Sequence, residues 1–258
     1  MFVNLSAIPL KPYRGEVFRN IFTCSPTQHI LDDLCEAEDF ELVDQFIQLT
    51  SEIDHQAPAY RRPFQYGHIE DEEIVAVFKK ENWRSSRFSD GQSYGVFYSA
   101  EDELTSIYEA SWWAYQLAQD NVWPRGEVYT SDRVMYRAFI EAEQLADLTR
   151  EENYFESLID PYDYHFCQSL GRAVQEKSWQ ALRTHSARRK RGICIPVFSL
   201  EVIKEPLILY YLKFHVNPDG VINVVSGHDE ANFSIRASEL LPYETKNSYP
   251  TSLRIRSL

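Results

Sequence analysis

An arginine, a tyrosine and a glutamate recur at equal steps across a short strand pattern and the helix pattern that follows it. Arg87 and Tyr98 are 98 − 87 = 11 positions apart, and Tyr98 and Glu109 are 109 − 98 = 11 positions apart. Residues 96–98 are typical of a short strand, and residues 101–119 are typical of a helix. One loop, one strand and one helix can therefore aim all three side chains at a single cleft.

The chemistry of these three side chains suits a nucleotide with a cleavable glycosidic bond. The guanidinium of Arg87 presents a planar fork of donors to phosphate oxygens. The ring of Tyr98 presents a stacking face, and a partly buried carboxylate at Glu109 can stabilise a developing positive charge. Each residue also has a purely structural interpretation: a surface ion pair for the arginine, a core position for the tyrosine and a solvated helix position for the glutamate.

The block that ends at Glu109 resembles the RES domain, a family named for its arginine, glutamate and serine. Three further segments resemble other parts of that family: its opening arginine segment at 16–19, its central helix at 163–171 and its closing serine loop at 184–188. In that loop, Ser186 lies 186 − 109 = 77 positions after Glu109. The resemblance extends over roughly residues 16–230.

The resemblance implies an α+β fold like that of ADP-ribosyltransferases, with a mixed β-sheet core and surrounding helices. It implies a toxin that breaks the nicotinamide–ribose bond of NAD, by phosphorolysis or hydrolysis, and so arrests growth. NAD is then a consumed substrate, inorganic phosphate is one of two candidate acceptors, and no cofactor is required. The partner that the resemblance implies is an Xre-like helix-turn-helix antitoxin.

The resemblance also assigns roles to seven residues. Glu109 holds the nicotinamide ribose and stabilises an oxocarbenium-like transition state, Arg87 clamps the pyrophosphate, and Ser186 hydrogen-bonds the ribose or a phosphate. The expected substrate-binding residues are Arg19, Tyr98, His165 and Arg188. Arg61 and Arg62 compete with Arg19 for the phosphates. The sequence offers no convincing base and orienting acid around Ser186, so we do not expect a hydrolase nucleophile there.

Two other functions remain open for the same residues. In the first, ADP-ribose is transferred to a protein side chain, which makes the chain a modifying transferase. In the second, the chain is a catalytically silent interaction module whose acidic surface binds a basic partner. The oligomeric state is also open, a homo-oligomer included.

Composition and charge limit the class of protein. The 258 residues, 44% of them hydrophobic, favour one RES-like domain over residues 1–258, with its core at about 16–230, a helical insertion at about 29–80 and a C-terminal extension at about 231–258. The formal net charge of −13 argues against generic binding to nucleic acid or to an anionic membrane. No segment reads as a signal peptide or reaches the roughly 18 apolar residues of a membrane span, so we expect a cytoplasmic protein.

Cysteine and histidine spacing gives no sign of a metal site or a disulfide. The four cysteines, at positions 24, 35, 167 and 194, lie in no close pairing, so we expect free thiols that are buried or nearly so. The seven histidines form no HExxH, HxH or mixed Cys/His spacing. We therefore expect a reaction without a metal ion.

Five basic residues gather between Arg183 and Arg191, on both sides of Ser186. Such a run is usually a solvated loop. Beside Ser186 it can also supply the local positive potential that draws an anionic dinucleotide or a phosphate. No aromatic platform is interleaved with it, which argues against a role in nucleic-acid binding.

Periodicity predicts the remaining elements. Two helices are expected within residues 29–54, an irregular loop at 55–67 and a helix or short strand at 74–78. Further expected elements are a strand at 127–141, a helix at 164–176 and β-rich segments at 197–198, 207–214 and 221–225. A turn at residues 217–220 joins the last two into an antiparallel hairpin. From Glu239 onward the chain has few apolar anchors, so we expect a tail or a late addition.

Overall fold

A mixed sheet of eight strands forms the centre of the computed structural model, which describes residues 8–22, 72–119, 126–226 and 233–243. The strands are β1 (Leu10–Phe22), β2 (Phe97–Ala100), β3 (Tyr129–Asp147), β4 (Ala181–His185), β5 (Ile193–Val197), β6 (Ile203–Val216), β7 (Val221–Ser226) and β8 (Phe233–Arg236). They run in the order β1-β2-β5-β4-β3-β6-β7-β8, and β1 also pairs with β3. The sheet therefore closes into a ring over β1, β2, β5, β4 and β3.

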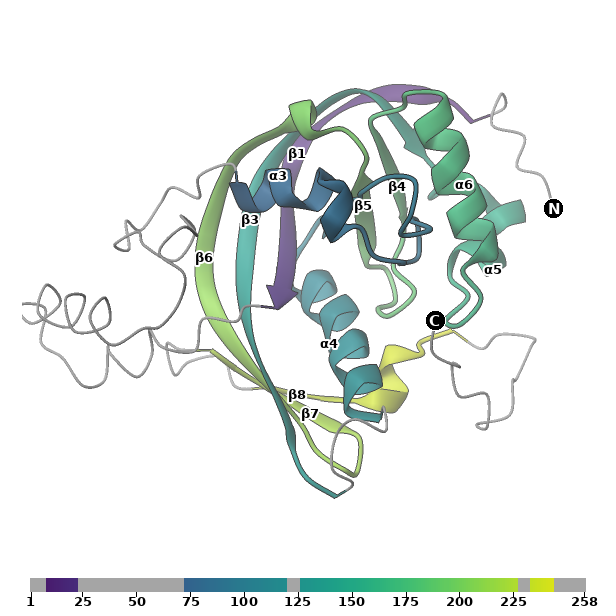
Figure 1. Cartoon of the computed structure of the whole chain (residues 1–258). Coiled ribbons are helices and arrows are strands. Elements are labelled where there is room, and N and C mark those ends of the chain that lie inside the picture. Colours follow the sequence, from purple (N-terminus) through teal and green to yellow (C-terminus); the bar gives the residue numbers. More distant parts are fainter. Residues whose placement is uncertain (1–7, 23–71, 120–125, 227–232, 244–258) are drawn as a thin grey trace, which may run out of the picture.

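The long strand β3 makes this closure possible. One of its edges pairs with β1 from Arg133 to Ala146. Its other edge pairs first with β6, up to Ile140, and then with β4, through residues 145–147. The β3–β4 pairing is parallel, and the other named pairings are antiparallel. Closure removes the free edges that β1 and β2 would otherwise expose, while β6, β7 and β8 extend the sheet beyond the ring (Figure 1).

Small and branched side chains fill the interior of the ring. Val17 of β1, Phe97 of β2, Ala138 of β3, and Ile195 and Val197 of β5 belong to one buried cluster, and each is at most 2% exposed. Alternate residues of a strand point to opposite faces, so one side of each strand supplies this cluster. The helix α3 (Glu72–Phe78) adds Ile74 to the same cluster.

Within the described residues, four helices accompany the sheet: α3 (Glu72–Phe78), α4 (Glu103–Gln119), α5 (Phe155–Leu158) and α6 (His165–Glu176). Short 3-10 turns are η4 (Lys80–Asn82), η5 (Glu152–Tyr154), η6 (Leu200–Val202) and η7 (Ala237–Leu240). The helix α4 begins after Asp102, whose carboxylate accepts the backbone N–H of Thr105 at 2.9 Å and so caps the helix. Trp112 and Ala114 of α4 pack with Phe214 of β6. α6 packs on the opposite side of the ring, where α5 accompanies it (Figure 1).

The mixed α+β fold class predicted from the sequence is confirmed. The helices expected at 101–119 and 164–176 are present as α4 and α6, and the hairpin at 207–225 is present as β6 and β7. Of the helix or short strand expected at 74–78, the structure has the helix α3. The strand expected at 127–141 is longer and reaches Asp147. The two helices within 29–54 and the loop at 55–67 lie outside the described residues, as do Cys24 and Cys35.

Two expectations were wrong or incomplete. The strands β1 and β4 were not predicted, because their pattern mixes charged with apolar residues and does not alternate strictly. The tail expected from Glu239 is instead anchored at its start, since Leu240 is fully buried against α4.

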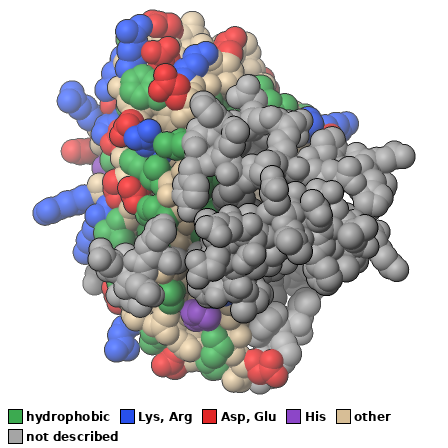
Figure 2. All heavy atoms as spheres, turned by 90° about the vertical axis from the view of Figure 1, so that its left-hand side faces the viewer, with side chains coloured by type: hydrophobic (Ala, Val, Ile, Leu, Met, Phe, Trp, Pro, Cys, Tyr) green, Lys and Arg blue, Asp and Glu red, His purple; other side chains and the backbone are tan. Residues whose placement is uncertain are grey.

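The described surface carries charges of both signs. Seen from the side of β6, the part of the surface that is not grey shows both basic and acidic side chains, with hydrophobic side chains among them (Figure 2). Exposed cross-strand ion pairs join Arg137 to Glu16 at 3.4 Å and Lys213 to Asp132 at 3.6 Å. None of the helices in the described ranges is long and apolar enough to cross a membrane.

Candidate active site

Glu109 and Ser186, which are 77 positions apart in the sequence, meet inside the protein. The hydroxyl of Ser186 donates a hydrogen bond to Oε1 of Glu109 over 2.6 Å. The same Ser186 oxygen accepts the backbone N–H groups of Arg188 at 3.0 Å and Arg189 at 3.1 Å. Since these two donors occupy the lone pairs of the hydroxyl oxygen, its hydrogen is directed to the carboxylate.

The thiol of Cys194 reaches the same carboxylate oxygen, 3.5 Å from Oε1 of Glu109. Burial raises the pKa of Cys194, and the charge of Glu109 raises it further, so the thiol stays protonated and can donate. Oε1 thus accepts two hydrogen bonds, whereas Oε2 accepts none from the described residues. Oε2 is therefore the oxygen that can face a ligand.

Arg188 is a fully buried cation beside this carboxylate. Its Nη2 donates to the carbonyl of Pro161 at 2.8 Å and to the hydroxyl of Tyr164 at 3.0 Å. The guanidinium lies 3.8 Å from the centre of the Trp112 ring, and burial lowers its pKa. Its Nε and Nη1 find no partner within the described part of the chain. Unpaired buried donors are costly, so this group is suited to an anionic ligand.

Arg87 is also buried, at 4% exposure, and its alternative interpretation as a surface ion pair is therefore wrong. Its Nη1 donates to the carbonyl of Leu158 at 2.9 Å, and its guanidinium lies 5.1 Å from the centre of the Tyr164 ring. Burial acts to lower the pKa of Arg87, but Tyr98 and Glu109 outweigh that effect and raise it. Arg87 therefore remains charged under all ordinary conditions.

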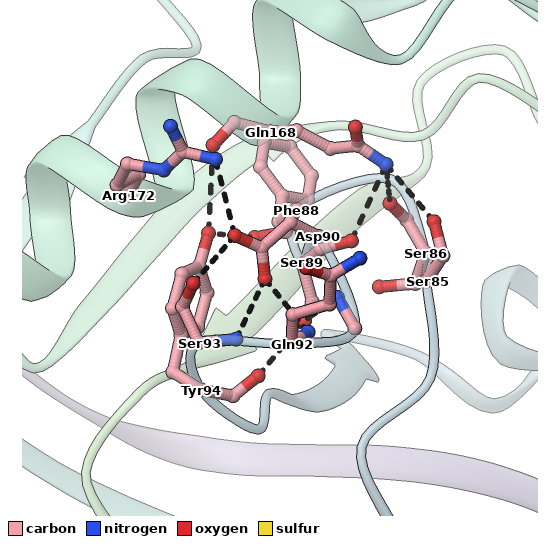
Figure 3. Close-up of polar contacts among 11 residues, drawn as sticks. Ser85, Ser86, Phe88, Ser89, Asp90, Gln92, Ser93, Tyr94, Gln168 and Arg172 are labelled. Carbon is pink, nitrogen blue, oxygen red and sulfur yellow. Dashed lines mark hydrogen bonds and ion pairs between the residues drawn. The ribbon is translucent and has the colours of Figure 1, made fainter.

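The loop that carries Arg87 is held against α6 by Gln168 (Figure 3). The amide nitrogen of Gln168 donates to the carbonyls of Ser86 at 3.0 Å and Ser89 at 3.3 Å. It also lies 3.2 Å from the hydroxyl of Ser85. One helix side chain thus binds the backbone on both sides of Arg87.

Asp90 and Tyr94 (Figure 3) and the glycine at position 171 complete this attachment. Asp90 forms an ion pair with Arg172 at 3.1 Å, and the hydroxyl of Tyr94 donates to the carbonyl of Phe88 at 2.9 Å. A Cβ atom at Gly171 would lie only 2.1 Å from the same Phe88 carbonyl. Glycine is therefore needed at this position of α6, because the loop backbone approaches the helix directly.

Tyr98 of β2 lies within the same group of residues. Its ring is stacked on Phe88, with 6.2 Å between ring centres and 24° between planes. Burial raises the pKa of its hydroxyl, and the neighbouring Cys194 and Glu109 raise it further. The thiol of Cys194 interacts with this hydroxyl, although no hydrogen bond of ordinary length joins the two.

Arg19 lies on β1, and its side chain reaches Phe97 of the neighbouring strand β2. Its guanidinium lies 4.7 Å from the centre of the Phe97 ring, and burial lowers its pKa to about 10. Its Nη1 has no partner in the described ranges. The competing residues, Arg61 and Arg62, lie outside them.

Two predicted site residues show no contact with this group among the described residues: Arg19, which packs on Phe97 of the core, and His165. The His165 side chain is 95% exposed at the start of α6, where Nδ1 lies 2.7 Å from the carboxylate of Asp163. The helix turns the neighbouring Tyr164 and Cys167 inward instead.

Of the two interpretations of the basic run at 183–191, a solvated loop does not hold for most of its residues. Arg183 lies on β4 and forms an ion pair with Glu101 at 2.7 Å, and Arg189 pairs with Asp102 at 3.1 Å. Arg188 is buried, so only Lys190 and Arg191 of this run are exposed. Most of the positive charge of the run is thus neutralised locally or held inside the site.

The RES domain family matches residues 56–217, which are 217 − 56 + 1 = 162 of the 258 positions. The chain belongs to the RES domain family. Among solved structures, it is similar to the M. tuberculosis MbcT-MbcA toxin-antitoxin complex, with a TM-score of 0.41 and 14% sequence identity over 78% of this chain and 86% of that chain. A search of curated proteins found no match.

The RES match contains most of the buried group but not all of the residues beside it. Arg87, Tyr98, Glu109, Ser186 and Arg188 lie within it. Arg19 precedes it, and Tyr243, whose ring packs 5.5 Å from that of Phe155, follows it.

The sequence analysis did not name four residues that lie around Glu109 and Ser186: Trp112, Tyr164, Cys194 and Tyr243. Helical periodicity places Trp112 on the apolar face beside Glu109, but nothing in the sequence indicates its contact with Arg188. Tyr164 lies inside the segment that resembles the central helix. Cys194 depends on the register of β5, where it lies opposite Ala100 and Thr184. Nothing in the sequence identifies Tyr243.

A cleft of about 590 Å³ opens next to the RES site, on the side of His185. Its lining consists of Thr149, Glu151, Glu152, Asn153, Phe155, Glu156, Ser157 and His185. His185 is fixed by a 3.0 Å contact between its Nε2 and the carbonyl of Thr149. The lining does not include Glu109, Ser186 or Arg188, so the cleft and the buried group are distinct features.

Proposed function

We propose that this RES domain consumes NAD by cleaving its nicotinamide–ribose bond, with inorganic phosphate or water as the acceptor. The observation that best supports the proposal is the 2.6 Å hydrogen bond from Ser186 to Oε1 of Glu109. It fixes a buried carboxylate and leaves Oε2 for a substrate. A fixed, poorly solvated charge stabilises a transition state without having to reorganise.

The reaction separates charge at the ribose, which is what such a carboxylate can stabilise. The C–N bond breaks, nicotinamide leaves with the bonding electron pair, and positive charge develops on the ribose carbon and ring oxygen. Glu109 lies against that charge through Oε2. A lone pair of phosphate or water then forms the new C–O bond, and the acceptor loses a proton to solvent. No metal ion or cofactor is needed to balance these steps.

The buried arginines supply the positive potential that an acidic chain otherwise lacks. Arg188 keeps two unpaired nitrogens, Arg19 keeps one, and Arg87 stays charged. Guanidinium groups bind the oxygens of a pyrophosphate through paired hydrogen bonds. We therefore assign the phosphates of NAD to this group and the stacking of a base or nicotinamide to Tyr98.

In the cell, loss of NAD would arrest growth, so the chain would act as a cytoplasmic toxin. A toxin of this kind needs a partner that restrains it, and we propose an Xre-like helix-turn-helix antitoxin. The formal charge of −13 makes direct action on nucleic acid unfavourable. This agrees with a substrate that is small and soluble.

The test is to incubate the purified protein with NAD, with and without phosphate, and to identify the products. Free nicotinamide is expected from the wild type, and ADP-ribose 1″-phosphate is expected only if phosphate is the acceptor. Glu109→Gln, which keeps the shape but removes the charge, should lower kcat by about 10²-fold or more. The matched control is Glu176→Gln, at an exposed position of α6, which should behave as the wild type.

Two outcomes would support the competing functions. Transfer of labelled ADP-ribose to protein, without free product, would indicate a modifying transferase. Intact NAD at high protein concentration, together with growth arrest that Glu109→Gln does not relieve, would favour the silent interaction module.

A further inference from the structure

Tyr164, the residue that directly precedes α6, contacts both of the buried arginines beside Glu109. Its hydroxyl accepts a hydrogen bond from Nη2 of Arg188 over 3.0 Å. The centre of its ring lies 5.1 Å from the guanidinium carbon of Arg87. The face of an aromatic ring attracts a cation, and a hydroxyl oxygen accepts a hydrogen bond from one. One side chain therefore stabilises two positive charges that come from different loops.

The segment between α5 and α6 adds backbone acceptors to these contacts. The carbonyl of Leu158, at the end of α5, accepts a hydrogen bond from Nη1 of Arg87 over 2.9 Å. The carbonyl of Pro161 accepts one from Nη2 of Arg188 over 2.8 Å. The same short segment thus binds both guanidinium groups, and Tyr164 is the residue in it that contacts both.

These partners are neutral, so they fix the two guanidinium groups without cancelling their charges. Neither Arg87 nor Arg188 forms an ion pair with a carboxylate of the described residues, unlike Arg183 and Arg189. Burial lowers the pKa of Arg188, and the charge of Arg87 lowers it further. The two cations therefore repel each other, and an anion bound to both would relieve that repulsion.

We infer that Tyr164 is a positioning residue, which holds Arg87 and Arg188 at a separation that lets them bind two adjacent phosphates and so selects a diphosphate over a monophosphate. This inference rests on the proposed function, which supplies a dinucleotide with a pyrophosphate. Two guanidinium groups that are already fixed lose little freedom when they bind such a group. Tyr164 acts through the two arginines and not on the substrate itself.

Two nucleotides that share adenosine and differ by one phosphate test this selection. Calorimetric titration gives Kd for ADP and for AMP with the wild type, Tyr164→Phe and Tyr164→Leu. The phenylalanine variant keeps the ring on Arg87 but loses the acceptor for Arg188, and the leucine variant loses both. The matched controls are Tyr210→Phe and Tyr210→Leu on β6, where a half-buried tyrosine packs on the cluster beside α4 and donates to Glu103.

We expect the wild type to bind ADP at least about tenfold more tightly than AMP, the effect of a second charged contact. This preference should fall to about threefold in Tyr164→Phe and disappear in Tyr164→Leu, because the arginines are then free to move apart. Both Tyr210 variants should keep the preference of the wild type. KM for NAD should rise in parallel, by about 5- to 10-fold in Tyr164→Phe. Thermal unfolding establishes that each variant is folded, and Tyr164→Phe decides the matter if Tyr164→Leu does not fold.

An equal loss of affinity for ADP and AMP in the Tyr164 variants would overturn the inference, because a purely structural residue would weaken both. A preference that these variants leave unchanged, or a wild type that does not distinguish the two nucleotides, would overturn it as well.

The release of nicotinamide from NAD tests the reaction separately. If the wild type cleaves NAD and its preference for ADP does not depend on Tyr164, the proposed function stands and the positioning role fails. If NAD stays intact while the preference is lost in the Tyr164 variants, the positioning role stands and the proposed reaction fails.

Discussion

The guanidinium of Arg188 lies 3.8 Å from the centre of the Trp112 ring, and this contact joins the loop after β4 to the helix that carries Glu109. Trp112 is one turn beyond Glu109 on α4, so both side chains project from neighbouring positions. A desolvated cation above an indole ring is stabilised by about 2 kcal/mol. Arg188 is thereby held in place relative to the carboxylate before any ligand binds.

Replacing Arg188 by lysine should weaken NAD binding although it preserves the charge. An ammonium group cannot donate to Pro161 and Tyr164 while it also stacks on Trp112. We expect KM for NAD to rise by about tenfold or more, the loss of one or two charge-assisted hydrogen bonds. Steady-state kinetics provide the measurement, and Arg191→Lys at an exposed position of the same loop is the control. Equal effects of both variants would contradict a special role for Arg188.

Ser186→Ala should slow the reaction more than it weakens binding. Without the hydroxyl, Oε1 of Glu109 keeps only Cys194 as a recorded donor, and the carboxylate can turn away from the substrate. We expect kcat to fall by about 10- to 100-fold, in the range of one lost orienting hydrogen bond. A rise of KM at unchanged kcat would show that Ser186 binds substrate but does not orient Glu109.

Two buried cysteines offer a matched pair of substitutions. Cys194 contacts Glu109 at 3.5 Å, whereas the Cys167 thiol lies 3.5 Å from the carbonyl of Ser157. Both are fully buried free thiols, as predicted. Cys194→Ala should lower kcat by about 3- to 10-fold, while Cys167→Ala should chiefly lower the melting temperature. Equal losses of kcat would assign both effects to packing.

Gly171→Ala should disturb the site from a distance. The added methyl group would meet the carbonyl of Phe88 at 2.1 Å, so either α6 or the Arg87 loop must move. We expect a loss of stability of about 1–3 kcal/mol and a raised KM for NAD. Urea unfolding and kinetics measure the two effects. Ser169→Ala, at an exposed position of the same helix, should change neither.

Acid should destabilise the fold through Asp147. Burial acts to raise the pKa of this carboxyl, but hydrogen bonds from Lys11 and Thr149 and the charge of Arg183 lower it to about 2. Because the folded pKa lies below the unfolded value near 3.9, the stabilisation is present above about pH 4 and is lost as the pH falls toward 2. The melting temperature of the wild type should therefore drop across this range, and that of Asp147→Asn should drop less.

The helices and the hairpin could be predicted because their signals are local. The period of α4 and α6 and the turn at residues 217–220 are contained within a few residues. The strands β1 and β4 could not be predicted, because each is stabilised by a partner distant in sequence. Phe18 of β1 lies opposite Arg137 of β3, and Ala181 of β4 lies opposite Leu145 of β3. Closure of the sheet into a ring depends on these non-local pairings, which periodicity does not encode.

The same distinction applies to the site. The equal spacing of Arg87, Tyr98 and Glu109 predicted that their side chains meet, and the structure places them together. The segment around His165 resembles the family, but this did not show where the His165 side chain points. The exposure of a helix side chain depends on that direction. The sequence also could not show that part of the positive charge at 183–191 is neutralised. The ion pairs with Glu101 and Asp102 arise only when the chain is folded.

The closed ring also governs how activity can be lost. Tyr98 lies on β2, Cys194 on β5, and Ser186 directly after β4, so three of its five strands carry or adjoin site residues. No one of these strands can detach without breaking pairings on both of its sides. Local opening of the site is therefore coupled to opening of the barrel itself, and hydrogen exchange of these strands should follow global unfolding. A population of half-assembled, partly active molecules is not expected, so catalytic competence should be gained and lost in a single cooperative step.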